Sequence, residues 1–285
     1  MTHWYWLAVF SLIVLGTQRF LYKVAAEQGC NTAITTFVFM ATVAVMSWCV
    51  YLPRAASLVP SVPLLLVSLI NSIGFLTTTL ATIEALKNLA SGTVYTLTRL
   101  STALSIVFSL IYFGERLTLS QGLGVLLALV VIVIFARSRG ETAAGSFYAR
   151  RGFVLVGLAV LGGATSTVSS KFAAMHVDSF GFMALSYTSS ALLVLLVKQG
   201  MLPTRAEQHL KPALVLGLAM GLANFIGYYA LLQALARGPL AIIAPLAGMY
   251  FVVALLLSYL VYRDRLTRPQ VLGVVLTMLS ILLMR

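Results

Sequence analysis

Charged residues are scarce in this 285-residue sequence, at 9% of the chain, and acidic residues are the scarcest, with 7 Asp and Glu against 19 Lys and Arg. A soluble globular domain carries about 25% charged residues. Hydrophobic residues make up 60% of the chain, and the mean hydropathy is +1.00. The shortage of charge therefore excludes a soluble globular protein and predicts an integral membrane protein.

Residues that hold metals or perform catalysis are also few. Cys30 and Cys49 lie in or beside one apolar segment, which favours small packing residues over a disulfide or a metal site. His3, His176 and His209 lie at the chain start or in predicted loops. Nucleophile-elbow, zinc-protease, Walker and dinucleotide motifs are absent. We therefore predict no catalytic residue, no metal and no cofactor, and we do not expect an enzyme.

Long apolar windows take up most of the chain. Each is close to or above the roughly 17 to 25 residues that a helix needs to cross about 30 Å of hydrocarbon. Backbone groups in lipid must be satisfied within a helix or a closed barrel, and no barrel-type alternation of apolar and polar residues occurs. The pattern predicts an all-α membrane protein with ten spans. Nine windows lack Asp, Glu, Lys and Arg, and a tenth is broken only by Arg99: 1–18, 28–53, 55–83, 88–114, 117–136, 152–170, 179–197, 212–236, 238–262 and 269–284.

A repeated motif divides the chain into two copies. Gly-Glu-Arg-Leu-Thr at 114–118 is echoed by Arg-Asp-Arg-Leu-Thr at 263–267, and the Gln, Leu, Gly and Val that follow each motif repeat at the same offset. The copies are predicted as five-helix units at 1–140 and 150–285. An odd number of spans per unit places the second unit upside down, which gives an inverted-topology repeat. The motif residues of interest are Gly114, Glu115, Arg116, Asp264 and Arg265.

Two five-helix copies that each end in this motif resemble the EamA-like families of the drug/metabolite transporter superfamily. The resemblance covers the whole chain, with the motif complete at 114–118 and altered at 263–267. It implies a ten-helix carrier of the inner membrane with a central cavity, for amino acids, other metabolites, nucleotide derivatives or drugs. We expect transport of a small polar or anionic metabolite by alternating access. The alternative is a membrane-embedded enzyme or a non-transport partner subunit.

Arg99 is the sharpest single feature of the apolar windows. A guanidinium deep in a membrane helix costs about 2.5 to 3.5 kcal/mol on insertion scales. On helical spacing, Tyr95, Arg99 and Thr102 share one face. One interpretation is a cavity wall whose arginine binds a carboxylate or phosphate of the solute. The other is an arginine that pairs with Glu84 or with helix carbonyls and holds the bundle together.

Polar stripes on other segments add further candidates. Ser11, Gln18 and Tyr22 form such a stripe on the first segment. Hydroxyls can equally bond to their own helix, whereas a carboxamide or a phenol is harder to hide. The remaining candidates for the cavity are Asn71 and Thr78 on the third segment, Asn224 and Tyr228 on the eighth, and Pro245, which should kink the ninth.

Acidic and basic residues suggest secondary roles. Glu84 is the candidate for proton coupling, and Glu115 and Asp264 are expected to form corners by contacting backbone N–H groups or basic side chains. Lys23 and Lys171, which end equivalent helices, either reach to the membrane interface or gate the cavity.

The net charge of +12 is spread over short loops, which suits anionic lipid head groups and not nucleic acid. The expected partners are a small-molecule substrate and membrane lipid, with a homodimer left open. Loop charge places both termini outside, whereas the family resemblance implies termini inside. The orientation therefore stays open.

Overall fold

Every element of the described chain is helical apart from short connections. The computed structural model describes residues 3–55, 60–86, 94, 97–137, 146–198, 210–262 and 268–285. The helices are α1 His3–Glu27, α2 Thr32–Tyr51, α3 Val62–Leu86, α5 Leu100–Tyr112, α6 Leu119–Arg137, α7 Ser146–His176, α8 Ser179–Lys198, α9 Leu210–Arg237, α10 Leu240–Gly248, α11 Tyr250–Tyr262 and α12 Arg268–Leu283, with one 3-10 turn at Leu52–Arg54.

The outer surface of the bundle is apolar. Large side chains such as Ile111 and Leu119 are 79% and 83% exposed. A contiguous apolar exterior of this extent is unsuited to water and suits lipid. Helices long and apolar enough to cross a membrane occur at His3–Ala25, Ile34–Arg54, Val62–Thr82, Arg151–His176, Leu210–Arg237 and Leu240–Tyr262, and shorter apolar helices occur at Leu100–Tyr112, Leu119–Val131 and Val271–Leu283. The prediction of a multi-pass helical membrane protein is confirmed, while the count of ten spans stays a prediction.

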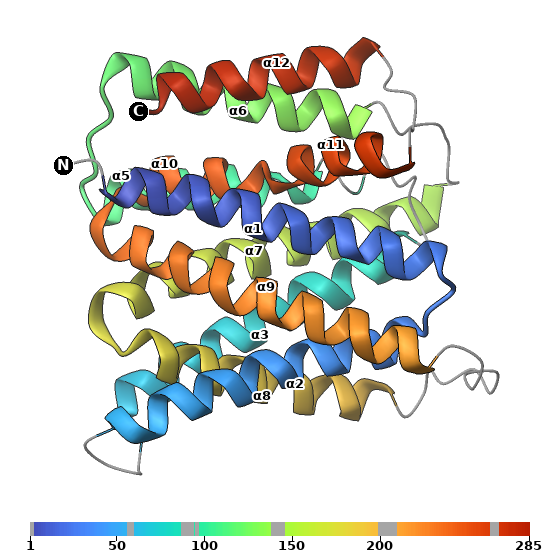
Figure 1. The fold of residues 1–285 in the computed structure, drawn as a ribbon. Coiled ribbons are helices and arrows are strands. Elements are labelled where there is room, and N and C mark those ends of the chain that lie inside the picture. The colour runs from blue at the N-terminus through green and yellow to red at the C-terminus, as the bar shows by residue number, and fades with distance from the viewer. Residues whose placement is uncertain are drawn as a thin grey trace.

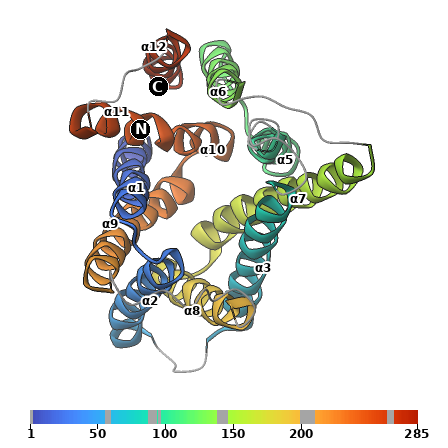
Figure 2. The same cartoon turned by 90° about the vertical axis from the view of Figure 1, so that its right-hand side faces the viewer.

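Helices from distant parts of the sequence pack side by side. Viewed along the bundle, α1 and α9 lie on one side, α3 and α7 on the other, α2 and α8 at one end, and α6 and α12 at the opposite end (Figure 2). Glycines permit the close approach of α3 to α7, because a Cβ added at Gly74 would lie 2.8 Å from the Gly162 carbonyl oxygen. Helices of the first half thus pack mainly against helices of the second half.

Both ends of the described chain lie at the same end of the bundle (Figure 1). The Tyr5 hydroxyl donates a hydrogen bond to the Ile281 carbonyl oxygen. The Arg285 Cζ atom lies 5.7 Å from the centre of the Trp6 ring. A chain whose ends meet on one side of a membrane has crossed it an even number of times.

Polar side chains gather inside the bundle, opposite to the arrangement in a soluble protein. Gln18, Asn71, Lys171 and Asn224 are each less than 9% exposed. Buried amides and amines require hydrogen-bond partners from neighbouring helices. The interior is therefore where polar contacts between helices are concentrated.

The first helix extends further than the apolar window predicted. The window ends at residue 18, but α1 continues through Arg19 and Lys23 to Glu27. The helix continues because its own hydrogen bonds satisfy the backbone, while the ionisable side chains find partners on other helices. Arg19 thereby lies about two turns inside α1.

Two segments expected to be continuous helices are interrupted instead. α5 begins at Leu100, and Arg99 before it forms a turn. The ninth segment is divided into α10 and α11 at Met249, four residues after Pro245. A proline disturbs the turn before it, so the kink predicted at Pro245 stays a prediction. The Met249 N–H bonds, at 3.1 Å, to a carbonyl three residues back, which tightens the end of α10.

Candidate functional site

The breaks in the fourth and ninth segments bring two arginines to one aromatic ring. The Arg19 Cζ atom lies 4.8 Å from the centre of the Tyr250 ring and 5.4 Å from that of Tyr22. The Arg99 Cζ atom lies 5.8 Å from the centre of the Tyr250 ring and 5.9 Å from that of Phe251. We call Arg19, Tyr22, Arg99, Tyr250 and Phe251 the two-arginine cluster. Tyr250 occupies its centre because it is the first residue of α11, directly after the break.

The charges of this cluster are compensated by aromatic faces and not by carboxylates. Among the described residues, no carboxylate lies within ion-pair distance of Arg19 or Arg99. Glu84 instead lies 3.7 Å from Arg151, so the proposed ion pair between Arg99 and Glu84 is not formed. The Arg19 side chain is exposed and that of Arg99 is partly buried. Neither arginine is therefore fully covered by protein atoms.

A chain of hydrogen bonds lies beside the cluster, and we call it the interior polar chain. The Asn224 Nδ2 atom donates to Gln18 Oε1 at 3.1 Å, and the Tyr187 hydroxyl donates to Asn224 Oδ1. These residues come from α9, α1 and α8. The carboxamide of Asn224 thus uses both of its ends to join three helices.

A second group of hydrogen bonds in the interior polar chain joins α9 and α3 to α7. The Tyr228 hydroxyl lies 2.9 Å from Ser170 Oγ. The Asn71 Nδ2 atom lies 2.8 to 3.2 Å from oxygens of Ser166, Ser169 and Ser170. Because an amide nitrogen has two hydrogens, it donates to only some of these at a time. Asn71 and Tyr228, singled out from sequence, therefore both bond to Ser170, whereas Asn224 belongs to the first group of hydrogen bonds.

Aromatic contacts connect the polar chain with the cluster. The Tyr187 ring stands edge-on to Tyr228 at 6.0 Å and to Phe39 at 6.1 Å. Phe39 in turn lies 6.4 Å from Tyr22, a member of the two-arginine cluster. The two groups of residues therefore form one continuous interior region.

Two predicted threonines have local contacts. The Thr78 hydroxyl donates to the Gly74 carbonyl at 2.9 Å and lies 3.2 Å from the Ala159 carbonyl, which places it in the α3–α7 packing. Thr102 is partly buried, and its N–H donates to the Arg99 carbonyl at 3.0 Å. Thr78 thus contacts neighbouring backbone, whereas Thr102 lies one turn from the cluster.

The other two cavity candidates have different outcomes. Pro245 is buried within α10, about one turn before the break that positions Tyr250. Tyr95 lies outside the described residues, so its predicted position on the face of Arg99 is not described.

Glu115 forms a corner between the two halves of the chain. Its carboxylate accepts hydrogen bonds from the Leu240 and Ala241 N–H groups at 2.7 and 2.9 Å, which caps the start of α10. Lys171 Nζ lies 3.6 Å from the same carboxylate and donates to two carbonyl oxygens at the end of α9, each at 2.7 Å. Glu115 thus makes the backbone N–H and lysine contacts expected of a corner residue, and Lys171 belongs to the same corner.

The rest of the motif shapes the turn around this corner. Gly114 has a φ of +60°, a left-handed conformation that favours glycine. The Thr118 N–H donates to Gln121 Oε1 at 3.1 Å, and the Gln121 N–H lies 3.3 Å from Thr118 Oγ1, a capping box at the start of α6. Arg116 is exposed. Asp264 and Arg265 of the second copy lie outside the described residues.

Sequence reasoning missed Arg19, Tyr187 and Tyr250. Arg19 stood at the edge of an ion-free window and was assigned to its boundary, although Gln18 and Tyr22 beside it had been singled out. Tyr250 lies two residues after Gly248, the position that aligns with Arg99, and directly after the break at Met249. The polar residues beside Arg19 were the signal that could have identified it, whereas Tyr250 had no signal of its own in the sequence.

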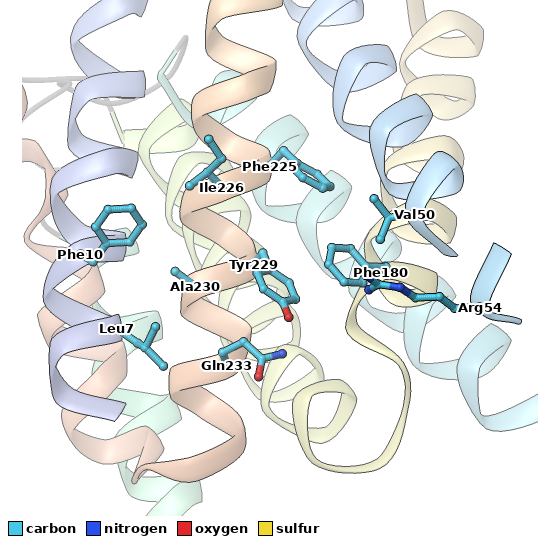
Figure 3. A pocket seen from close by; sticks show the side chains of 10 residues that line it. All are labelled: Leu7, Phe10, Val50, Arg54, Phe180, Phe225, Ile226, Tyr229, Ala230 and Gln233. Atoms are coloured by element: carbon cyan, nitrogen blue, oxygen red, sulfur yellow. The ribbon is translucent and has the colours of Figure 1, made fainter. Parts of the chain in front are cut away.

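A groove on the outside of the bundle contains none of the predicted site residues. It has a volume of about 420 Å³ and is mainly apolar, and Figure 3 shows Tyr229, Phe180 and Arg54 along its wall. The Phe180 and Tyr229 rings stack with centres 4.5 Å apart, and the Arg54 Cζ atom lies 5.2 Å from the Phe180 ring centre.

Within the described chain, no group of three or more His, Cys, Asp or Glu side chains could hold a metal ion.

Comparison with known proteins agrees with this architecture. A protein known from a crystal structure superposes with a TM-score of 0.80 over 99% of this chain and 96% of its own, at 16% identity, which shows a shared fold alone. In all, 29 solved chains match, and no curated protein matches. The model of the EamA-like transporter family matches residues 150–285, which confirms the resemblance for the second half of the chain. That half belongs to the EamA-like transporter family, within the drug/metabolite transporter superfamily.

Proposed function

We propose that this chain is an inner-membrane carrier that moves a small polar or anionic metabolite by alternating access between two inverted five-helix repeats, 1–140 and 150–285. The family match supports a membrane transporter. The two-arginine cluster is the single observation that carries the choice of solute, because a guanidinium pairs best with a carboxylate or a phosphate.

The pairing of helices supports two equivalent halves. The first helix of each half packs against the third helix of the other, as α1 does with α9 and α7 with α3. The second helices, α2 and α8, pack on each other, and so do the last helices, α6 and α12. Exchanging the halves leaves this scheme unchanged, as a pseudo-twofold axis requires.

Two lysines at equivalent positions support the same relationship. Lys171 Nζ lies 5.7 Å from the centre of the Phe113 ring, and Lys23 Nζ lies 4.9 Å from that of Tyr262. Each aromatic residue directly precedes the corner motif of the opposite half. Equivalent contacts made by both halves suit a protein that exchanges the conformations of its repeats.

Interrupted helices support a binding site near the middle of the bundle. Carriers with inverted repeats commonly bind solute where helices are broken, because free backbone groups and side chains meet there. Here the breaks at Arg99 and Met249 lie beside the cluster. The site takes residues from α1, from the start of α5 and from α11, and thus from both halves.

Transport is tested with purified protein in sealed liposomes. Radiolabelled amino acids, dicarboxylates and phosphate monoesters are supplied outside, and the vesicle contents are separated chemically after uptake. We expect one class of solute to enter chemically unchanged. Its uptake should exchange against the same unlabelled solute inside, because a binding site that faces each side in turn carries solute in both directions. Recovery of a modified product, or no flux of any solute above protein-free vesicles, would reject the proposal.

A further inference from the structure

Arg19 is a charged residue of the bundle that belongs to no sequence motif. It lies about two turns from the end of α1, next to buried Gln18, and its side chain is exposed although it lies within a membrane-spanning helix. Its guanidinium faces the rings of Tyr22 and Tyr250 at 5.4 and 4.8 Å. Contacts with two aromatic rings restrict the conformations of the arginine side chain. A side chain that is held in place in this way is suited to binding a solute.

The Tyr250 ring brings Arg19 together with Arg99. Their Cζ atoms lie 4.8 and 5.8 Å from the same ring centre. Two positive charges that share one ring repel each other, and the repulsion grows as the surroundings become less polar. A guanidinium does not lose its proton in a protein, so the pair cannot relieve the repulsion by becoming neutral.

The buried lysine of the Glu115 corner is compensated differently. Lys171 Nζ lies 3.6 Å from the Glu115 carboxylate. Arg19 and Arg99 have aromatic faces, which stabilise a cation less than a carboxylate does. No carboxylate in the described part of the chain lies within ion-pair distance of them. The cluster is therefore built with an excess of two positive charges.

We infer that the two-arginine cluster binds a small organic solute with two negative charges, one on each guanidinium, and that Arg19 is the second anion-binding residue. Carboxylate and phosphate groups accept the paired N–H groups of arginine. The Tyr22, Tyr250 and Phe251 rings contact the carbon skeleton of the solute and fix both side chains. This inference rests on the proposed carrier function and specifies its substrate class.

The test compares solutes that differ in one charge. Binding of succinate and of its monoamide, succinamate, is measured by calorimetry on the purified protein, and a second pair consists of methyl phosphate and dimethyl phosphate. For at least one pair, we expect the dianion to bind at least tenfold more tightly than the monoanion. The preference should fall to about equal affinity in Arg19→Gln and in Arg99→Gln. Arg54→Gln, which removes a ring-stacked arginine of the outer groove, should keep it.

Equal affinity for dianion and monoanion in both pairs, or a preference that survives Arg19→Gln, would overturn the inference, and so would no binding of either dianion. The wild-type comparison needs no variant, so the test stands if Arg19→Gln does not fold. Arg19→Lys keeps the charge and should retain most of the preference. Liposome flux separates the two proposals. If only singly charged or neutral solutes are transported, the two-charge site is rejected, while the proposal that the protein is a carrier stands.

Discussion

Charges within the helix bundle are compensated in opposite ways at the Glu115 corner and in the two-arginine cluster. At the corner, the carboxylate has two backbone N–H groups and Lys171, and Lys171 has two carbonyl oxygens as well. In the cluster, Arg19 and Arg99 share a tyrosine ring. The corner satisfies every charge within the protein, whereas the cluster leaves positive charge for an outside anion.

This difference separates a structural role from a binding role. A buried ion pair with complete hydrogen bonding costs several kcal/mol to break, so it fixes a geometry. A charge balanced by a solute that comes and goes is free to bind and release. Stability should therefore depend mostly on the corner, and transport mostly on the cluster.

The largest effect on stability is expected from Glu115→Ala. It removes the cap of α10 and leaves the ammonium of Lys171, whose side chain is 7% exposed, without its carboxylate. We expect a loss of about 3 to 5 kcal/mol, read as a large fall in melting temperature of the purified protein. The exposed neighbour Arg116, changed to alanine, should alter stability by less than about 0.5 kcal/mol. Equal melting temperatures for the two variants would remove the structural half of the comparison.

The interior polar chain beside the cluster should contribute less. Asn224→Ala leaves the Gln18 amide and the Tyr187 hydroxyl without their partner. We expect a loss of about 1 to 3 kcal/mol, since each buried polar group loses one hydrogen bond. Thr17→Ala on α1 is the control, because the Thr17 hydroxyl bonds only to a carbonyl of its own helix in the described structure. A destabilisation by Asn224→Ala as large as that of Glu115→Ala would show that the cluster region is as structural as the corner.

The contact between α3 and α7 supports the Asn71 end of the polar chain. A Cβ at Gly162 would lie 2.7 Å from the Gly74 carbonyl oxygen and 2.8 Å from Thr78 Oγ1. Gly162→Ala should cost about 1 to 3 kcal/mol by forcing the helices apart. Gly157→Ala, on the same helix with no atom within 4 Å of its Cβ, should be neutral or slightly stabilising. If the two alanine variants melt together, close packing does not hold this interface.

The smallest effect is expected at the exposed ion pair. The side chains of Arg151 and Glu84 are 62% and 35% exposed and 3.7 Å apart. Glu84→Gln should change stability by about 0 to 1 kcal/mol, because water screens such a pair. It should also leave transport unchanged unless Glu84 carries the coupling proton, so a flux that loses its dependence on a proton gradient in this variant would assign that role.

The membrane fold was predictable because the rule behind it is general. Long windows without charge must be helices in lipid, and a repeated corner motif marks equivalent ends. The role of Glu115 followed from its place beside such an end. The same rule misplaced Arg19, since a charge that finds aromatic partners inside the bundle need not end a helix.

The candidate site was harder to predict because it depends on tertiary contacts. Asn71, Asn224 and Tyr228 were visible as polar residues in apolar segments, but their hydrogen-bond partners on other helices arise from tertiary packing. Tyr250 had no signal of its own in a segment rich in apolar residues, and it acquires a position only through the break at Met249. Periodicity identifies which faces turn inward and not which residues meet there.

The most direct test measures melting temperature and flux per folded molecule for Arg99→Gln and Glu115→Gln side by side. We expect Arg99→Gln to keep a melting temperature near that of the unmodified protein and to lose at least tenfold in flux. Glu115→Gln should melt earlier and, at temperatures where it is folded, should retain more of its flux. An Arg99→Gln protein that unfolds early, or that transports normally when folded, would contradict the assignment of Arg99 to solute binding.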